Sequence, residues 1–84
     1  MTANDHWNVY MVLCRDGTLY TGIARSLEKR IDEHNSREAG ARYTRSRRPV
    51  ELVYSEEVPS RSEALKREYE IKKLPRSKKR QLIR

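Results

Sequence analysis

The sequence has few cysteines, no long apolar segment and no flexible linker, and each of these absences excludes a class of protein. Its one cysteine, Cys14, excludes an internal disulfide framework and a zinc site built on cysteines. No segment approaches the ~20 apolar residues that would span a bilayer, and the N-terminal stretch lacks the apolar run of a signal peptide. No Gly/Ser linker divides the 84 residues. We therefore expect one domain over residues 1–84, in the cytoplasm and with no membrane partner.

Acidic residues are few relative to basic ones. Nineteen Lys and Arg oppose twelve Asp and Glu, for a net charge of +7, and thirteen of the nineteen are arginine, whose planar guanidinium matches phosphate. Two segments without acids hold the excess: 42–48 carries four bases and 72–84 carries seven. Two basic segments on a mildly acidic body favour a polyanionic partner. For 72–84, a solvated and solubilising tail is the plain alternative.

An apolar run at 9–14 and a β-prone run at 18–23 predict a hairpin. Two registers are open. A two-residue turn would place Tyr10 and Tyr20 on opposite faces of the sheet. A three-residue turn with a G1 bulge would pair Tyr10 with Gly22 and put both phenols on one face.

Further signals complete the expected fold. Ser26 is a helix N-cap, and Ser60 opens a capping box. Alternation in a third strand puts Val50, Leu52 and Tyr54 on one face. The expected elements are strands at 9–14, 18–23 and 50–58, and helices at 27–35, 60–74 and from 75 onward. This order, ββαβα(α), predicts a small α/β or α+β domain around a three-stranded antiparallel sheet.

Glu68 is the most informative single residue. In the second predicted helix it falls in the apolar stripe with Ala64 and Ile71, whereas Glu63 and Glu70 fall on the solvent side. A carboxylate in that stripe requires a cation, a metal or hydrogen bonds to offset its desolvation. The functional interpretation is a ligand for Mg²⁺, which takes one or two carboxylates plus water and substrate phosphate. The structural interpretation is a buried ion pair with an arginine.

Arg30 and His34 lie one turn apart on the first predicted helix, where they offer a cation and an imidazole on one edge. Each has a plain structural alternative. Arg30 can form an exposed pair with Glu33, and His34 can be an ordinary histidine at a helix edge. Tyr10 and Tyr20 are, by the same standard, more often core aromatics than catalysts. Taken singly, none of these residues specifies a chemistry.

Taken in order, the residues resemble the GIY-YIG nuclease superfamily, and most closely its small stand-alone bacterial members. Asn8-Val9-Tyr10 and Tyr20-Thr21-Gly22 stand in place of the two name motifs. The Gly and Ile of the first motif and the central Ile of the second are replaced, at backbone or packing positions. The further matches are Arg30, His34-Asn35, Gly40, Tyr43-Thr44, Pro49, Leu52-Val53-Tyr54, Glu63-Ala64-Leu65, Glu68 and Ile71-Lys72, which extend the resemblance over nearly the whole chain.

The resemblance implies hydrolysis of DNA phosphodiester bonds with one Mg²⁺ or Mn²⁺ ion. It implies that Tyr20 or Tyr10 is the base or positions the water. It further implies that Arg30 contacts the scissile phosphate, His34 orients a tyrosine or the nucleophile, and Glu68 holds the metal. A site shared by both tyrosines favours the three-residue hairpin loop. A tyrosine pKa near 10 makes a poor base unless nearby cations lower it, which the cationic surroundings favour.

The resemblance also bears on the substrate. Larger nucleases of this family gain target choice from additional DNA-binding domains, and none is expected here. We therefore expect low sequence specificity, with structured or branched DNA as the substrate and any targeting left to DNA shape or a protein partner. The alternatives are a DNA- or RNA-binding module without catalysis and an adaptor for an acidic protein. The expected nucleic-acid contacts, with Tyr43 stacking on a base, are Arg42, Tyr43, Arg45, Arg47, Arg48, Lys72, Lys73, Lys78, Lys79 and Arg80.

Overall fold

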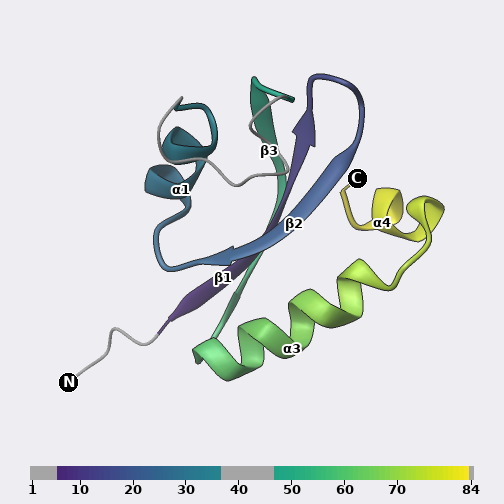
Figure 1. The fold of residues 1–84 in the computed structure, drawn as a ribbon. Coiled ribbons are helices and arrows are strands. Elements are labelled where there is room, and N and C mark those ends of the chain that lie inside the picture. Colours follow the sequence, from purple (N-terminus) through teal and green to yellow (C-terminus); the bar gives the residue numbers. More distant parts are fainter. Residues whose placement is uncertain (1–5, 37–46, 84) are drawn as a thin grey trace.

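A three-stranded antiparallel sheet forms the centre of the structure, a computed structural model that describes residues 6–36 and 47–83 (Figure 1). The strands are β1 (Trp7–Cys14), β2 (Leu19–Ala24) and β3 (Val50–Val58), in the spatial order β2-β1-β3. The predicted apolar run lies in the central strand, where residues 9–12 are all buried. A strand covered on both faces needs such a continuous run.

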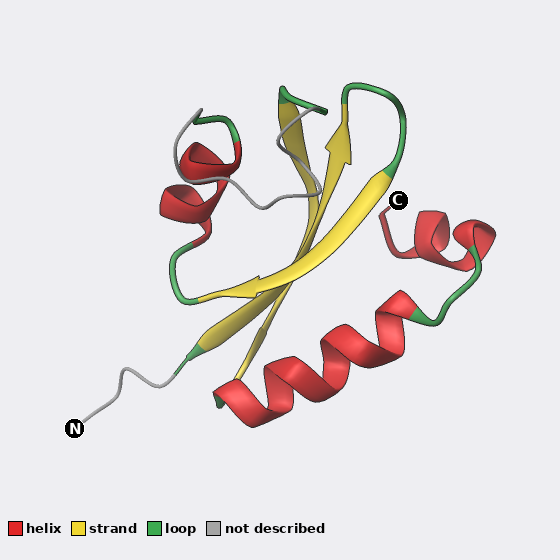
Figure 2. Cartoon of the chain, viewed as in Figure 1, coloured by secondary structure: helices red, strands yellow, loops and turns green. Residues whose placement is uncertain are grey.

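Helices cover both faces of this sheet (Figure 2). Helix α1 (Leu27–His34) lies on one side, and α3 (Arg61–Lys72) and α4 (Arg76–Ile83) lie on the other. The order ββαβαα confirms the predicted α+β fold. The first two predicted helices end one and two residues earlier than expected, because Asn35 and Lys73 are their C-caps.

Serine hydroxyls begin two of the helices, as the sequence predicts. Ser26 Oγ accepts a hydrogen bond from the Lys29 backbone N–H at 3.3 Å, and Ser60 Oγ accepts one from the Glu63 backbone N–H at 3.2 Å. Each bond satisfies one of the N–H groups that a helix leaves without a partner in its first turn. The N-terminal ends of α1 and α3 are therefore fixed by local sequence.

The hairpin between β1 and β2 adopts the three-residue loop. Gly17 has φ +87°, and its backbone N–H donates to the Cys14 carbonyl at 2.9 Å. Glycine adopts this left-handed conformation without the penalty that a Cβ would bring. Tyr10 consequently pairs with Gly22 and Val12 with Tyr20. Both phenols lie on one face of the sheet, as the family resemblance requires.

A β-bulge corrects one prediction about β3. Leu52 lies opposite Val12, but Tyr54 lies opposite Met11, because the pairing shifts between these two β1 residues. The extra residue in β3 reverses the alternation of its side chains. Tyr54 therefore faces α3 and α4, whereas Val50 packs on the opposite face. The prediction that Val50, Leu52 and Tyr54 share a face is wrong.

Two separate cores result from the alternation in β1. Tyr10 and Val12 pack with Leu27 and Ile31 of α1, while Val9 and Met11 pack on the other face. The partners on that second face include Ala64, Ile71, Leu82 and Ile83 from the two C-terminal helices. The fold thus directs Tyr10 toward α1.

Within the described residues, no helix has the length and apolar character needed to cross a membrane.

Candidate active site

Tyr10 and His34 form the buried centre of the site. The phenol oxygen of Tyr10 and Nε2 of His34 are 2.7 Å apart, and the two residues are only 1% and 0% exposed. Tyr10 comes from the middle of β1 and His34 from the last turn of α1. A hydrogen bond this short between two buried groups fixes the orientation of both rings.

Gly22 allows the Tyr10 side chain to reach this position. A Cβ at residue 22 would lie 2.5 Å from the Tyr10 hydroxyl oxygen and 2.7 Å from Cζ, which is closer than any real Cβ contact. The Tyr10 ring therefore occupies the space that a side chain on β2 would otherwise fill. The pairing of Tyr10 with glycine is thus a packing requirement of the site.

Tyr20 brings a second phenol to the same imidazole. Its ring centroid lies 5.4 Å from that of His34, with an angle of 70° between the planes, and the corresponding values for Tyr10 are 5.8 Å and 66°. These edge-to-face contacts are favourable for aromatic rings. Unlike Tyr10, Tyr20 is only half-buried. One phenol of the pair is therefore sealed in the protein, and the other reaches the surface.

Arg30 lies beside these rings on α1. Its Nη1 donates to Glu33 Oε1 at 2.8 Å, which is the i,i+3 pair that the sequence offers as a structural alternative. Arg30 also acts on Tyr10, because its hydrogen bonding and positive charge favour the phenolate. Burial disfavours the guanidinium, but its interactions with Glu33 and Tyr10 outweigh this and raise the Arg30 pKa. Arg30 is thus a permanent cation at the edge of the site.

Burial sets the protonation of the central pair. Desolvation raises the pKa of Tyr10 although Arg30 opposes it, and the charges of Tyr20 and Glu68 raise it further. The lowering expected from the cationic surroundings therefore does not occur at Tyr10. Desolvation, and then the charge of Arg30, lower the pKa of His34 to about 4. At neutral pH the site holds a neutral phenol bonded to a neutral imidazole.

Glu68 approaches the site from α3, on the other side of the sheet. Its side chain is 19% exposed, with Ala64 and Ile71 buried beside it on the helix, and Glu63 and Glu70 are exposed as predicted. Its partner is the Lys72 ammonium at 3.2 Å, instead of the arginine that the sequence suggests.

The charge of Glu68 nevertheless reaches the centre of the site. Its carboxylate raises the pKa of Tyr10, so the two groups lie within electrostatic range. Tyr10 is therefore in direct or electrostatic contact with each of the other four residues that the sequence predicts for the site, namely Tyr20, Arg30, His34 and Glu68.

The donor set fits a magnesium-type ion held by one carboxylate. Glu68 offers a hard oxygen ligand that is partly buried and is paired with the exposed Lys72. Within residues 6–36 and 47–83, no three His, Cys, Asp or Glu side chains gather in a metal-binding cluster. Mg²⁺ commonly keeps several waters and binds through one or two carboxylates and substrate phosphates. Glu68 could therefore hold such an ion with water and a phosphate as the remaining ligands.

Two arginines of the first basic segment, 42–48, form hydrogen bonds within the fold. Arg47 Nε donates to Asp16 Oδ2 at 2.9 Å, and Arg48 donates to the Ser36 backbone carbonyl. These bonds brace the hairpin loop and the end of α1. The other predicted contacts of this segment, Arg42, Tyr43 and Arg45, lie outside the described residues.

The described basic side chains of the second segment, 72–84, are more exposed to solvent. Lys72 pairs with Glu68, and the Lys73 ammonium lies 4.7 Å from the Tyr69 ring centroid. The remaining predicted contacts lie on α4, where Lys78 and Arg80 are exposed and Lys79 is half-buried.

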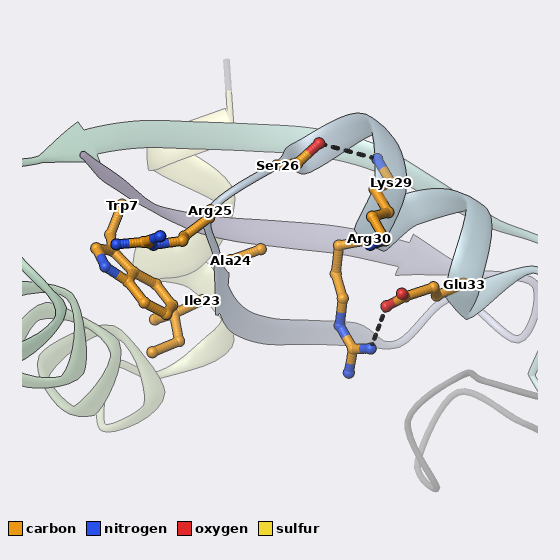
Figure 3. A pocket seen from close by; sticks show the side chains of 8 residues that line it. All are labelled: Trp7, Ile23, Ala24, Arg25, Ser26, Lys29, Arg30 and Glu33. Atoms are coloured by element: carbon orange, nitrogen blue, oxygen red, sulfur yellow. Dashed lines mark hydrogen bonds and ion pairs between the residues drawn. The ribbon is translucent and has the colours of Figure 1, made fainter. Parts of the chain in front are cut away.

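A pocket beside Arg30 was not predicted from the sequence. It has a volume of about 410 Å³ and lies where β2 ends and α1 begins (Figure 3). Trp7 forms one wall, and the Arg25 guanidinium carbon lies 5.4 Å from its ring centroid. Trp7 and Arg25 are eighteen positions apart in the sequence, and only strand pairing brings them together. The residues that line the pocket are Trp7, Ile23, Ala24, Arg25, Ser26, Lys29, Arg30 and Glu33.

Comparison with known proteins identifies relatives of the whole chain. The model of the GIY-YIG catalytic domain matches residues 6–81. The UPF0213 protein DP2720 of Desulfotalea psychrophila is 62% identical over 83 residues, which are 99% of this chain and 76% of that protein. The UPF0213 protein SSP2268 of Staphylococcus saprophyticus is 57% identical over 94% of this chain and 95% of that protein.

A solved structure is also similar. The solution NMR structure of the UPF0213 protein BH0048 from Bacillus halodurans superposes with a TM-score of 0.59 at 45% identity. The match covers 93% of this chain and 82% of that protein.

Proposed function

The chain belongs to the GIY-YIG catalytic domain family, and from this membership we propose that it is a single-domain, cytoplasmic DNA endonuclease dependent on Mg²⁺ or Mn²⁺. The observation that carries the proposal is the arrangement around Tyr10. Its hydroxyl bonds to His34 at 2.7 Å, the Tyr20 ring packs edge-on against the same imidazole, and the charges of Arg30 and Glu68 lie within electrostatic range of the phenol. Hydrolysis of a phosphodiester needs an activated water, a cation at the transition state and a metal.

Tyr20 is the phenol that meets the nucleophilic water. Tyr10 is sealed in the protein away from water, and its raised pKa keeps it protonated at neutral pH, so it is not the base. Tyr20 is half-buried, and its ring packs against the same imidazole. In this proposal Tyr20 first releases its own hydroxyl proton to solvent. The resulting phenolate oxygen positions the water and accepts its proton, which returns Tyr20 to the neutral phenol, while Tyr10 and His34 hold the Tyr20 ring in place.

Arg30 binds the scissile phosphate. It is charged at every accessible pH, and its side chain is 30% exposed at the edge of the site. Glu33 occupies one nitrogen of the guanidinium, which leaves further donors of the fork for phosphate oxygens. Placed there, the cation would stabilise the negative charge that develops as water attacks.

Glu68 would hold the metal ion. When bound, the ion would stabilise charge on the leaving oxygen. Lys72 balances the carboxylate until then, and because its ammonium is exposed it can turn to solvent at little cost. The ion pair thus offsets the desolvation of a half-buried carboxylate until an ion takes its place.

A DNA- or RNA-binding module without catalysis is the second candidate. The observation that favours it is that Arg30 and Glu68 each already have a partner within the protein, Glu33 and Lys72 respectively. In such a module both charged residues would stabilise the fold, and nucleic acid would bind through the basic surface alone.

Nicking of supercoiled DNA separates the two candidates. We expect cutting with Mg²⁺ or Mn²⁺ and none in EDTA. Arg30→Ala and Glu68→Ala should each lower the rate at least about a hundredfold, because each removes charge stabilisation of the transition state. The matched controls are Arg15→Ala and Glu70→Ala, which remove an exposed arginine and an exposed glutamate outside the site. Equal cutting by all four variants would show a contaminant or a wrong site. Salt-sensitive binding without any cutting would establish the binding module.

A further inference from the structure

The pocket beside Arg30 combines two kinds of chemistry. Its walls are apolar, from the Trp7 ring at the start of β1 and from Ile23 and Ala24 at the end of β2 (Figure 3). Its rim is cationic, with Arg25 and Lys29 both exposed. The side chain of Arg30 belongs to this pocket and to the proposed catalytic site, so the two share one residue.

Positive charge exceeds negative charge in the pocket. Three basic side chains line it, together with one acid, Glu33, whose carboxylate is held by Arg30 at 2.8 Å. The exposed ammonium of Lys29 adds positive charge at the rim beside Arg30, and positive charge attracts an anion. An anionic ligand that is purely polar would make no use of the apolar walls.

Planar groups are concentrated at the Trp7 wall. The guanidinium of Arg25, which also lines the pocket, lies 5.4 Å from the Trp7 ring centroid. Indole rings and guanidinium planes are the surfaces on which unstacked nucleobases stack in proteins. The volume of about 410 Å³ is within the range of ordinary ligand pockets.

We propose that this pocket binds one unpaired nucleotide of the DNA strand, next to the scissile phosphate. Its base would lie against Trp7 and Arg25, and its phosphate would contact Lys29 beside Arg30. A base inside a duplex has both faces covered by its neighbours, so only an unpaired base can enter. The inference rests on the proposed nuclease function, and it assigns to this pocket a preference for DNA with single-stranded segments.

The fluorescence of Trp7 tests the proposal directly, because Trp7 is the only tryptophan in the chain. The protein is titrated in EDTA, so that nothing is cut, with a short single-stranded oligonucleotide, an abasic oligonucleotide of the same length and charge, and a duplex. We expect saturable quenching by the single strand. The abasic strand and the duplex should quench with apparent affinities about 5- to 150-fold weaker, the worth of stacking one base.

Two variants extend the test. Arg25→Ala should bring quenching by the single strand close to that by the abasic strand, because it removes one stacking plane. Lys66→Ala removes an exposed lysine on α3 outside the pocket and should leave the quenching unchanged. Thermal melting of both variants shows that the fold is intact.

Equal quenching by all three nucleic acids would overturn the proposal, because the pocket would then sense charge alone. Absence of quenching by any of them would overturn it as well. Nicking with Mg²⁺ is measured in parallel, so the two claims fail separately. Cutting without quenching would retain the nuclease and refute the pocket, and quenching without cutting would do the reverse.

Discussion

His34 links the two phenols of the site, and its burial determines how it can act. Its imidazole bonds to the Tyr10 hydroxyl at 2.7 Å and packs edge-on against Tyr20. Because the ring is wholly buried and close to Arg30, its pKa falls to about 4, and it is neutral wherever the protein is folded near neutral pH. A neutral imidazole can accept or donate one hydrogen bond, which suits the positioning of a phenol.

The buried imidazole predicts an acid-sensitive fold. An unfolded histidine takes up its proton near pH 6.5, whereas His34 in the folded protein does so near pH 4. The unfolded state therefore binds more protons between these values, and the stability present above pH 6.5 is lost as the pH falls toward 4. The loss amounts to up to about 3 kcal/mol in the free energy of unfolding.

Urea unfolding at a series of pH values measures this loss. The matched variant is His34→Gln, which keeps a polar side chain but has no proton to gain. It should show a much flatter dependence between pH 6.5 and 4, even if it is less stable overall. The same slope in both proteins would mean that other groups cause the acid sensitivity.

At the scale of elements, the hairpin of β1 and β2 positions the site. The three-residue loop sets the register that places Tyr10 opposite Gly22 and both phenols on the α1 face. A shift of one residue would have moved one tyrosine to the other core. Gly22 then gives the Tyr10 ring the space to reach His34. The geometry of the site is thus decided by one turn and one glycine.

Replacement of this glycine should displace Tyr10. The Cβ of Gly22→Ala would lie 2.5 Å from the Tyr10 hydroxyl oxygen, so we expect a loss of about 1–3 kcal/mol in the free energy of unfolding. The control is a double-mutant cycle with Tyr10→Phe, measured by urea unfolding. The phenylalanine ring keeps Cζ, which would lie 2.7 Å from the added Cβ, so part of the cost should remain, but without the hydroxyl contact at 2.5 Å Gly22→Ala should cost measurably less. Additive costs would contradict the close contact between the Tyr10 hydroxyl group and residue 22.

The same elements show what sequence patterns can and cannot predict. The capping serines, the apolar run of β1 and the placement of Glu68 follow from local spacing, and all were predicted. The bulge in β3 was not, because strict alternation gives no sign of an inserted residue until the partner strand is known. The Trp7 pocket was missed for a similar reason, since it joins residues from three elements. The raised pKa of Tyr10 depends on burial, which overrides the charges that a sequence displays.

At the scale of the whole molecule, the basic residues that give the net charge of +7 have several distinct roles. Arg47 and Arg48 brace loops, and Lys72 balances Glu68. The open cations of the described residues include those of α4, a short helix whose apolar residues pack against the sheet. We propose that this helix contributes a phosphate-binding surface to the DNA interface.

Salt dependence measures this contribution. In EDTA, the double variant Lys78→Gln/Lys79→Gln should weaken binding to duplexes of different sequence equally. It should also reduce the slope of log K against log salt by about 0.9 for each phosphate that the protein no longer neutralises. Lys66→Gln, an exposed lysine on α3, is the control and should change neither. An unchanged slope in the double variant would place the DNA interface elsewhere.

The most direct test of the proposed nuclease is the single-turnover cleavage rate of Tyr20→Phe with saturating Mg²⁺ and DNA. This change removes one hydroxyl group and keeps the ring against His34. The matched control is Tyr69→Phe, in which the same atom is removed from an exposed tyrosine on α3. The proposed mechanism predicts a rate at least about a hundredfold lower for Tyr20→Phe and an unchanged rate for Tyr69→Phe. Equal cleavage by both variants would contradict it.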